Sequence, residues 1–120
     1  MNSISFNPDD TVAVDGPIFE NVPLEIHYHP DRLPRCRQPT GLWGIAIFYR
    51  FHPGDVLIFS DGWSSGDQTG SGFFVPRSIP VPRNANKIEM WFENTDESGC
   101  VAFDNNFGQN YTFDVVPFQK

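Results

Sequence analysis

The stretch Leu42-Trp43-Gly44-Ile45-Ala46-Ile47-Phe48-Tyr49-Arg50-Phe51 decides the fold class of this chain. When it is extended, apolar side chains occupy both of its faces, which is typical of a strand at the centre of a sheet. The turn sequence His52-Pro53-Gly54-Asp55 follows at once. We therefore predict a central strand over residues 42–51 that ends in a tight turn.

The segments on either side of this strand also favour extended structure. In residues 22–28 apolar and polar side chains alternate, and eleven prolines and ten glycines interrupt the chain at short intervals. Further strands are predicted at residues 56–60, 73–75, 88–92, 100–103 and 111–118. Because no segment has a helical period, we expect an all-β antiparallel sandwich of about seven or eight strands. Residues 1–120 form one domain, in which residues 1–20 are an extended N-terminal arm or a first strand.

Composition excludes two classes of partner. The net charge is −7, the isoelectric point is near 4.6, and Lys87 and Lys120 are the only lysines, so the chain lacks the cations that a phosphate backbone needs. The first ten residues have neither a basic start nor an apolar run, and no later run is long enough to span a bilayer. We expect no nucleic-acid partner, no membrane insertion and no Sec signal, hence a cytoplasmic location or release by a non-classical route.

The two cysteines, Cys36 and Cys100, are far apart in the sequence, so they form neither a CxxC redox pair nor a cysteine-rich zinc cluster. They form either one disulfide or two buried thiols. A bridge would stabilise the fold by roughly 4 kcal/mol on the chain-entropy account.

The segment Phe103-Asp104-Asn105-Asn106-Phe107-Gly108-Gln109-Asn110-Tyr111 predicts a structured hairpin loop, because Asn, Asp and Gly tolerate left-handed backbone. Amides beside aromatic faces suit a sugar, which offers hydroxyls at its rim and C–H groups on its faces. The alternative is that these polar groups satisfy only the turn's own backbone.

This segment resembles the terminal signature of starch-binding carbohydrate-binding modules, which is usually Trp-Asp-Asn-Asn followed by a Gly and Asn-Tyr. The similarity continues upstream through residues 81–94, with the Asn84-Ala85-Asn86 turn and the strand that ends at Phe92-Glu93-Asn94. The first half of the chain does not match those modules. It looks more like an uncharacterised bacterial domain that shares the same ending.

The resemblance implies an immunoglobulin-like sandwich that binds α-glucans through aromatic platforms and signature amides. On the matching positions it points to Asp104, Asn105, Asn106, Asn110 and Tyr111 as sugar-binding residues. Phe103 stands where those modules carry Trp.

Three tryptophans are candidate stacking platforms. Trp63 lies in a Gly-, Ser- and Asp-rich stretch predicted to be a loop, where its ring either binds a ligand or caps the sandwich. Trp91 points away from Ile88, Met90 and Phe92 on a regular strand, which places it on an outer face. Trp43 belongs to the most apolar strand and is a core residue.

A metal site is a weaker hypothesis. His27 and His29 share one strand face, and Glu25 or Asp31 could complete their coordination. Two histidines and a carboxylate on a polar strand face are more often only solvated, so we expect no metal and no other cofactor.

The sequence contains no Gly-x-Ser-x-Gly elbow, phosphate loop or HExxH motif, and we predict no enzymatic activity. Two hypotheses remain. The first is a non-catalytic module that binds an α-glucan or related glycan. The second is a protein-interaction or structural sandwich of a bacterial assembly without a sugar ligand. A module without a catalytic neighbour would act through a homo-oligomer or a protein partner.

Overall fold

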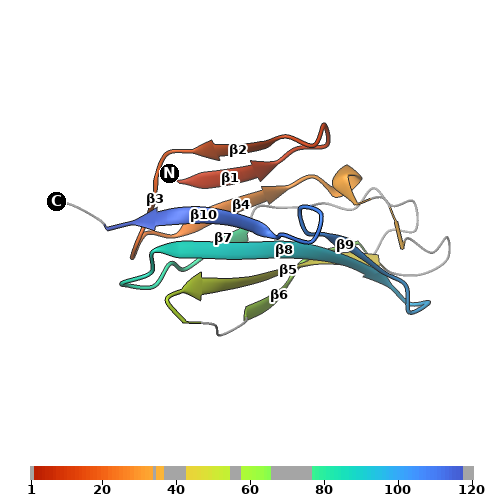
Figure 1. Cartoon of the computed structure of the whole chain (residues 1–120). Coiled ribbons are helices and arrows are strands. Elements are labelled where there is room, and N and C mark those ends of the chain that lie inside the picture. The colour runs from red at the N-terminus through yellow and green to blue at the C-terminus, as the bar shows by residue number, and fades with distance from the viewer. Residues whose placement is uncertain (1, 34, 37–42, 55–57, 66–76, 118–120) are drawn as a thin grey trace.

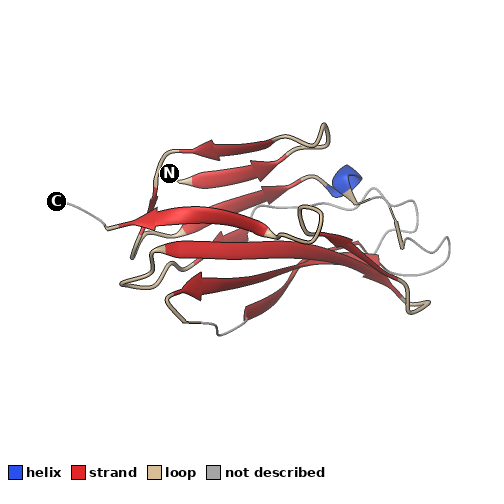
Figure 2. Ribbon diagram, in the orientation of Figure 1, coloured by secondary structure: helices blue, strands red, loops and turns tan. Residues whose placement is uncertain are grey.

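The computed structural model describes residues 2–33, 35–36, 43–54, 58–65 and 77–117, and at residues 30 and 59–65 it describes the backbone alone. Within these ranges the chain forms ten strands and one short 3₁₀ helix, η1 (Pro30–Arg32), as Figures 1 and 2 show. The strands are β1 (Ser3–Phe6), β2 (Val12–Asp15), β3 (Ile18–Phe19), β4 (Leu24–Tyr28), β5 (Trp43–His52), β6 (Ile58–Ser65), β7 (Arg77–Ile79), β8 (Lys87–Asp96), β9 (Val101–Asp104) and β10 (Tyr111–Val116).

The strands form two sheets that pack face to face (Figure 1). One sheet has the order β2-β1-β4-β7; the other has the order β3-β10-β8-β5-β6, and β9 pairs with β8 beside this path. The predicted all-β sandwich is confirmed. The sandwich was predicted to be antiparallel, but β1 pairs with β4 and β3 with β10 in parallel, so both sheets are mixed. Since η1 spans three residues, none of the described residues belongs to a helix that could cross a bilayer.

The core lies between the sheets and follows from the two-residue period of a strand. The strand β5 buries Trp43, Ile45, Ile47 and Tyr49, as predicted for the central strand. Its neighbour β8 buries Ile88, Met90, Phe92 and Asn94 in the same alternation. The opposite sheet contributes Phe6 and Tyr28, whose rings lie 4.8 and 4.1 Å from that of Phe92.

The strand after the His52 turn differs from its prediction. It was expected over residues 56–60, with Trp63 in the following loop, but β6 extends through Ser65 and pairs Trp63 with Ile45. The register shifts between Ile45 and Ile47, which pair with Trp63 and Ser60, so β6 holds one extra residue there. This bulge lets a strand contain Asp61 and Gly62, residues that disfavour strands. Predicted strand 73–75 lies outside the described residues.

Cys36 and Cys100 form a disulfide with a Cα–Cα distance of 5.3 Å. The bridge ties the segment after η1 to the β8–β9 turn, across 64 positions of sequence. Beside it, the fully buried Asn94 donates from Nδ2 to the carbonyl oxygens of Arg35 and Cys36, at 2.7 and 2.9 Å. One covalent and two hydrogen bonds therefore fix residues 35–36 against the larger sheet.

Replacing both cysteines by serine should lower the free energy of unfolding by about 4 kcal/mol, because a long loop in the unfolded chain is no longer closed. Urea denaturation of the wild type and the double variant measures this difference. As a control, dithiothreitol should destabilise the wild type and leave the variant unchanged. Equal stability of the two oxidised proteins would contradict a structural role for the bridge.

Candidate functional site

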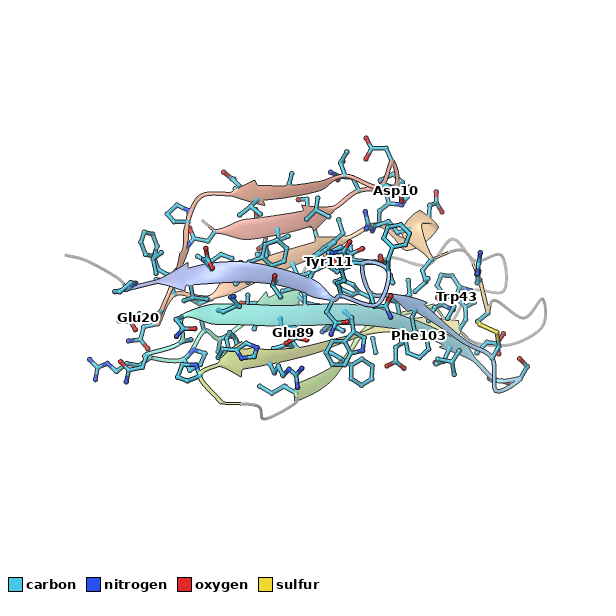
Figure 3. All side chains as sticks on the ribbon, in the orientation of Figure 1. Asp10, Glu20, Trp43, Glu89, Phe103 and Tyr111 are labelled. Atoms are coloured by element: carbon cyan, nitrogen blue, oxygen red, sulfur yellow. A yellow bond between two sulfur atoms is a disulfide. The ribbon has the colours of Figure 1, made fainter. Side chains whose placement is uncertain are left out.

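A groove of about 500 Å³ opens at the end of the sandwich where the Asn-rich loop lies. The described residues that line it are Asp10, Val12, Arg32, Phe103, Asp104, Asn105, Asn106, Phe107 and Tyr111. Asp10, Phe103 and Tyr111 lie around this end in Figure 3. Its volume is within the range of about 300–1,000 Å³ that is typical of small-molecule sites.

Two phenylalanines form exposed walls of this groove. Phe107 is 100% exposed, and Phe103 is 54% exposed because it faces outward on β9, opposite Glu93. The φ angle of Phe107 is 57°, in the left-handed region that a bulky side chain rarely adopts. The loop therefore holds an apolar ring in solvent on a strained backbone, an arrangement that concentrates at functional sites.

The loop shape comes from its own hydrogen bonds. The backbone carbonyl oxygen of Asn105 accepts a hydrogen bond from the backbone N–H of Asn110 at 2.7 Å. The side-chain oxygen Oδ1 of Asn105 accepts from the backbone N–H of Gly108 at 3.0 Å. Asn106 Nδ2 donates to the Asn110 carbonyl at 3.2 Å. In each of these two side chains, one polar atom of the amide thus forms a hydrogen bond within the turn. Among the described residues, Asn105 Nδ2 and Asn106 Oδ1 have no hydrogen-bond partner, and both residues line the groove.

Arg32 and Asp104, which both line the groove, form an ion pair whose side chains are only 4% and 12% exposed. Arg32 Nε donates to Asp104 Oδ2 at 3.0 Å, and Tyr28 donates to the same oxygen at 2.6 Å. Tyr111 donates to Asp104 Oδ1 at 2.5 Å and accepts from the Arg32 guanidinium at 2.9 Å. The same guanidinium donates to the carbonyl oxygens of Asn7 and Thr11 and lies against the Phe6 ring.

The electrostatics of this cluster keep its charges fixed. Burial is the largest cause that raises the pKa of Tyr111 to about 12, and the Asp104 carboxylate raises it as well. The same two causes raise the pKa of Tyr28 further. Burial alone would lower the pKa of Arg32, but the hydrogen bond and charge of Asp104 outweigh it and the pKa rises. Near neutral pH Arg32 is therefore a cation and both phenols are neutral.

Asn110 lies outside the groove. Its Nδ2 donates to Glu89 Oε2 at 2.7 Å on the outer face of the larger sheet, where Glu89 also accepts two hydrogen bonds from Arg50 and contacts His52. The hydrogen bond from Arg50 is the largest cause that lowers the pKa of Glu89 to about 2. Of the three signature asparagines, Asn105 and Asn106 therefore line the groove, whereas the Asn110 side chain donates to Glu89.

The tryptophans do not line the groove in the described structure. Trp43 is 3% exposed, as predicted for a core residue. Trp91 is half-buried on the outer face, where its ring is stacked on Phe48 with centroids 5.6 Å apart and its Nε1 donates to Glu93 at 3.4 Å. Trp63 is a strand residue, and its side chain lies outside the described part of the structure.

The histidines separate rather than converge. His27 contacts Glu25 on β4, whereas His29 follows the end of that strand and accepts a hydrogen bond from the Asp31 amide. Within the described residues, no three His, Cys, Asp or Glu side chains are placed to hold a metal ion. The weak hypothesis of a metal at His27 and His29 gains no support.

Sequence reasoning identified Asp104, Asn105, Asn106 and Tyr111, which the structure brings together, and missed Arg32, Phe103 and Phe107 as groove residues. The two phenylalanines could have been predicted from the sequence, because they stand directly before and after Asp104-Asn105-Asn106. Nothing local marks Arg32, because its partner lies 72 positions away.

The chain belongs to DUF6209, a family of unknown function whose model matches residues 2–116. Searches of curated proteins and of solved structures found no match.

Replacing Asp104 by Asn should lower the free energy of unfolding by about 3–5 kcal/mol, because it leaves the buried Arg32 cation without a counter-charge. Asp114→Asn makes the same chemical change at an exposed position of β10 and should cost less than about 0.5 kcal/mol. Urea denaturation of both variants measures the difference. Equal effects would show that the ion pair does not stabilise the fold.

Replacing Glu89 by Gln should destabilise the protein at neutral pH but not at pH 2. A carboxylate with a lowered pKa stabilises the fold above its unfolded value near 4.5, and this contribution disappears as the pH falls toward about 2. At pH 7 the substitution should lower the free energy of unfolding by roughly 1 kcal/mol. The effect is modest because Arg50 and His52 are about one-third exposed, so water screens their charges. Thermal denaturation of the wild type and the variant between pH 7 and pH 2 measures this difference in stability. A difference that does not change with pH would contradict the lowered pKa of Glu89.

Proposed function

Membership of this family carries no function with it, so we propose one from the groove: the protein is a non-catalytic glycan-binding domain. The observation that carries the proposal is the groove itself, in which two exposed phenylalanine rings stand beside uncommitted amide atoms. A pyranose offers C–H faces to aromatic rings and hydroxyls to planar amides, so its recognition needs both kinds of group together.

The polar atoms available in the groove support this assignment. Asn105 Nδ2 can donate and Asn106 Oδ1 can accept, since only the other half of each amide is used by the turn. Asp10 adds an exposed carboxylate at the rim. Donors and acceptors within one groove match a hydroxyl, which both donates and accepts.

The groove is also preorganised. The Asn105 and Asn110 hydrogen bonds fix the loop, and the Arg32–Asp104 pair fixes Tyr111 in the groove lining. Ordering the loop in advance reduces the entropy lost on binding. The strained backbone of Phe107 supports a role for its ring, since a glycine would fit that φ angle without strain.

The ligand class follows from the resemblance to starch-binding modules, which implies an α-glucan or related glycan and an immunoglobulin-like arrangement of strands. In this proposal Phe103 and Phe107 take the stacking role assigned above to Trp63 and Trp91. Asp104 and Tyr111 line the groove and hydrogen-bond to each other, and Asn110 anchors the loop through Glu89.

The exposed apolar side chains support a second candidate function, a protein-interaction surface. Val101 and Phe103 of β9 and Phe107 of the loop are 48%, 54% and 100% exposed. Apolar side chains in such exposure are typical of interfaces as well as of ligand sites. In that case the groove would receive a side chain of a partner or of a second copy.

Truncating either groove phenylalanine should weaken binding of maltotetraose about fivefold, because an aromatic contact contributes roughly 1 kcal/mol. Phe107→Gly should do so without lowering stability, since the ring is fully exposed and glycine accepts the left-handed backbone. Isothermal titration calorimetry with Phe103→Ala, Phe107→Gly and the control Trp91→Ala measures the effect. The control should change the Kd less than twofold.

Binding that is lost only in Trp91→Ala would move the site to the outer face of the larger sheet. Absence of binding to any neutral or charged oligosaccharide, together with a wild-type dimer that Phe107→Gly dissociates, would overturn the glycan proposal in favour of the interaction surface. Light scattering of the same variants gives that second result.

A further inference from the structure

A second hollow of about 700 Å³ adjoins the groove and shares Arg32 and Phe103 with it. Its remaining walls are formed by Leu33, Arg35, Cys36, Cys100, Val101 and Ala102. The exposed Phe103 ring therefore belongs to the lining of both hollows. A ligand stacked on that ring reaches both, so the surface suits a chain of sugar units better than a single one.

The charge of the second hollow differs from that of the whole protein. Among the described residues that line it, two are arginines and none is acidic, although the chain carries a net charge of −7. Arg32 is neutralised by Asp104. Arg35 is exposed and, among the described residues, its side chain has no ion-pair partner. Within the described part of the structure, Arg35 thus gives this hollow a cation without an ion-pair partner.

The backbone that carries Arg35 is built into the fold. The fully buried Asn94 donates to the carbonyl oxygens of Arg35 and Cys36, and the disulfide holds Cys36 to Cys100. Cys36 itself has a φ of 57°, an uncommon conformation maintained by these contacts. These contacts therefore hold the backbone from which the Arg35 side chain projects.

We propose that the second hollow binds the carboxylate of an acidic sugar, with Arg35 as its charged contact, so that the ligand is a glycan containing a uronic acid. This inference rests on the glycan-binding function and specifies its ligand class. A guanidinium presents two parallel N–H groups that match a planar carboxylate. An isolated uronate suits this hollow better than a polyanion, because the acidic protein would repel a polyanion.

The test compares four tetrasaccharides of α-linked glucose. One is neutral maltotetraose, one carries a single terminal glucuronic acid, one carries the methyl ester of that acid, and one carries a sulfate ester at the same carbon. We expect the glucuronate to bind wild-type protein about tenfold more tightly than its methyl ester at low salt, and this preference to shrink in 1 M NaCl.

The Arg35→Gln variant should bind the acid and the ester equally, while Arg35→Lys should retain part of the preference. Arg83→Gln is the matched control, because Arg83 is exposed and does not line either hollow. It should keep the full tenfold preference. Thermal denaturation checks that each variant is folded.

The outcomes separate this inference from the function on which it rests. If all four sugars bind equally and Arg35→Gln changes nothing, glycan binding stands and the carboxylate subsite is overturned. Equal or tighter binding of the sulfate ester would overturn the assignment to a carboxylate. If no sugar binds to any variant, the glycan-binding function itself falls.

Discussion

The Arg32–Asp104 ion pair is the interaction on which this end of the molecule depends. It joins η1, which follows a strand of the smaller sheet, to β9 of the larger one, and tyrosines from both sheets hydrogen-bond to the same carboxylate. Arg32 also donates to two carbonyl oxygens of the turn between β1 and β2. A buried charge is costly without a partner. The polar groups of η1, β4, β9, β10 and the β1–β2 turn therefore depend on one another for their hydrogen-bond partners.

The groove is a consequence of this arrangement. Asp104 faces inward on β9, so its neighbour Phe103 must face outward. Tyr111, at the start of β10, is held by the same carboxylate, and the loop between them has to turn back within a few residues. That short closure is made with left-handed residues, among them Phe107, which leaves its ring in solvent. A buried polar cluster thus places two apolar rings and two partly used amides around one opening.

Much of the fold was predictable from local patterns. Alternation in residues 22–28 and the apolar run over 42–51 reflect the two-residue period of strands, and the structure has β4 and β5 there. The loop of residues 105–110 was predicted because Asn and Gly favour left-handed turns. The extent of β6 was not predictable, since Asp61, Gly62 and the serines beside them disfavour strands, and only pairing with β5 keeps them extended.

The sequence by itself determined the all-β class, the central strand and the amide-rich turn, because these depend on side-chain period and on residues close to one another. Tertiary structure alone decided which groups remain available to a ligand. Asn110 is used by Glu89, 21 positions away, and Arg32 by Asp104, 72 positions away, so neither is a local property of its segment. The same applies to Arg35, whose place beside Phe103 depends on Asn94 and on the disulfide to Cys100. Long-range pairing of charges and amides, which no local period encodes, fixed the candidate site.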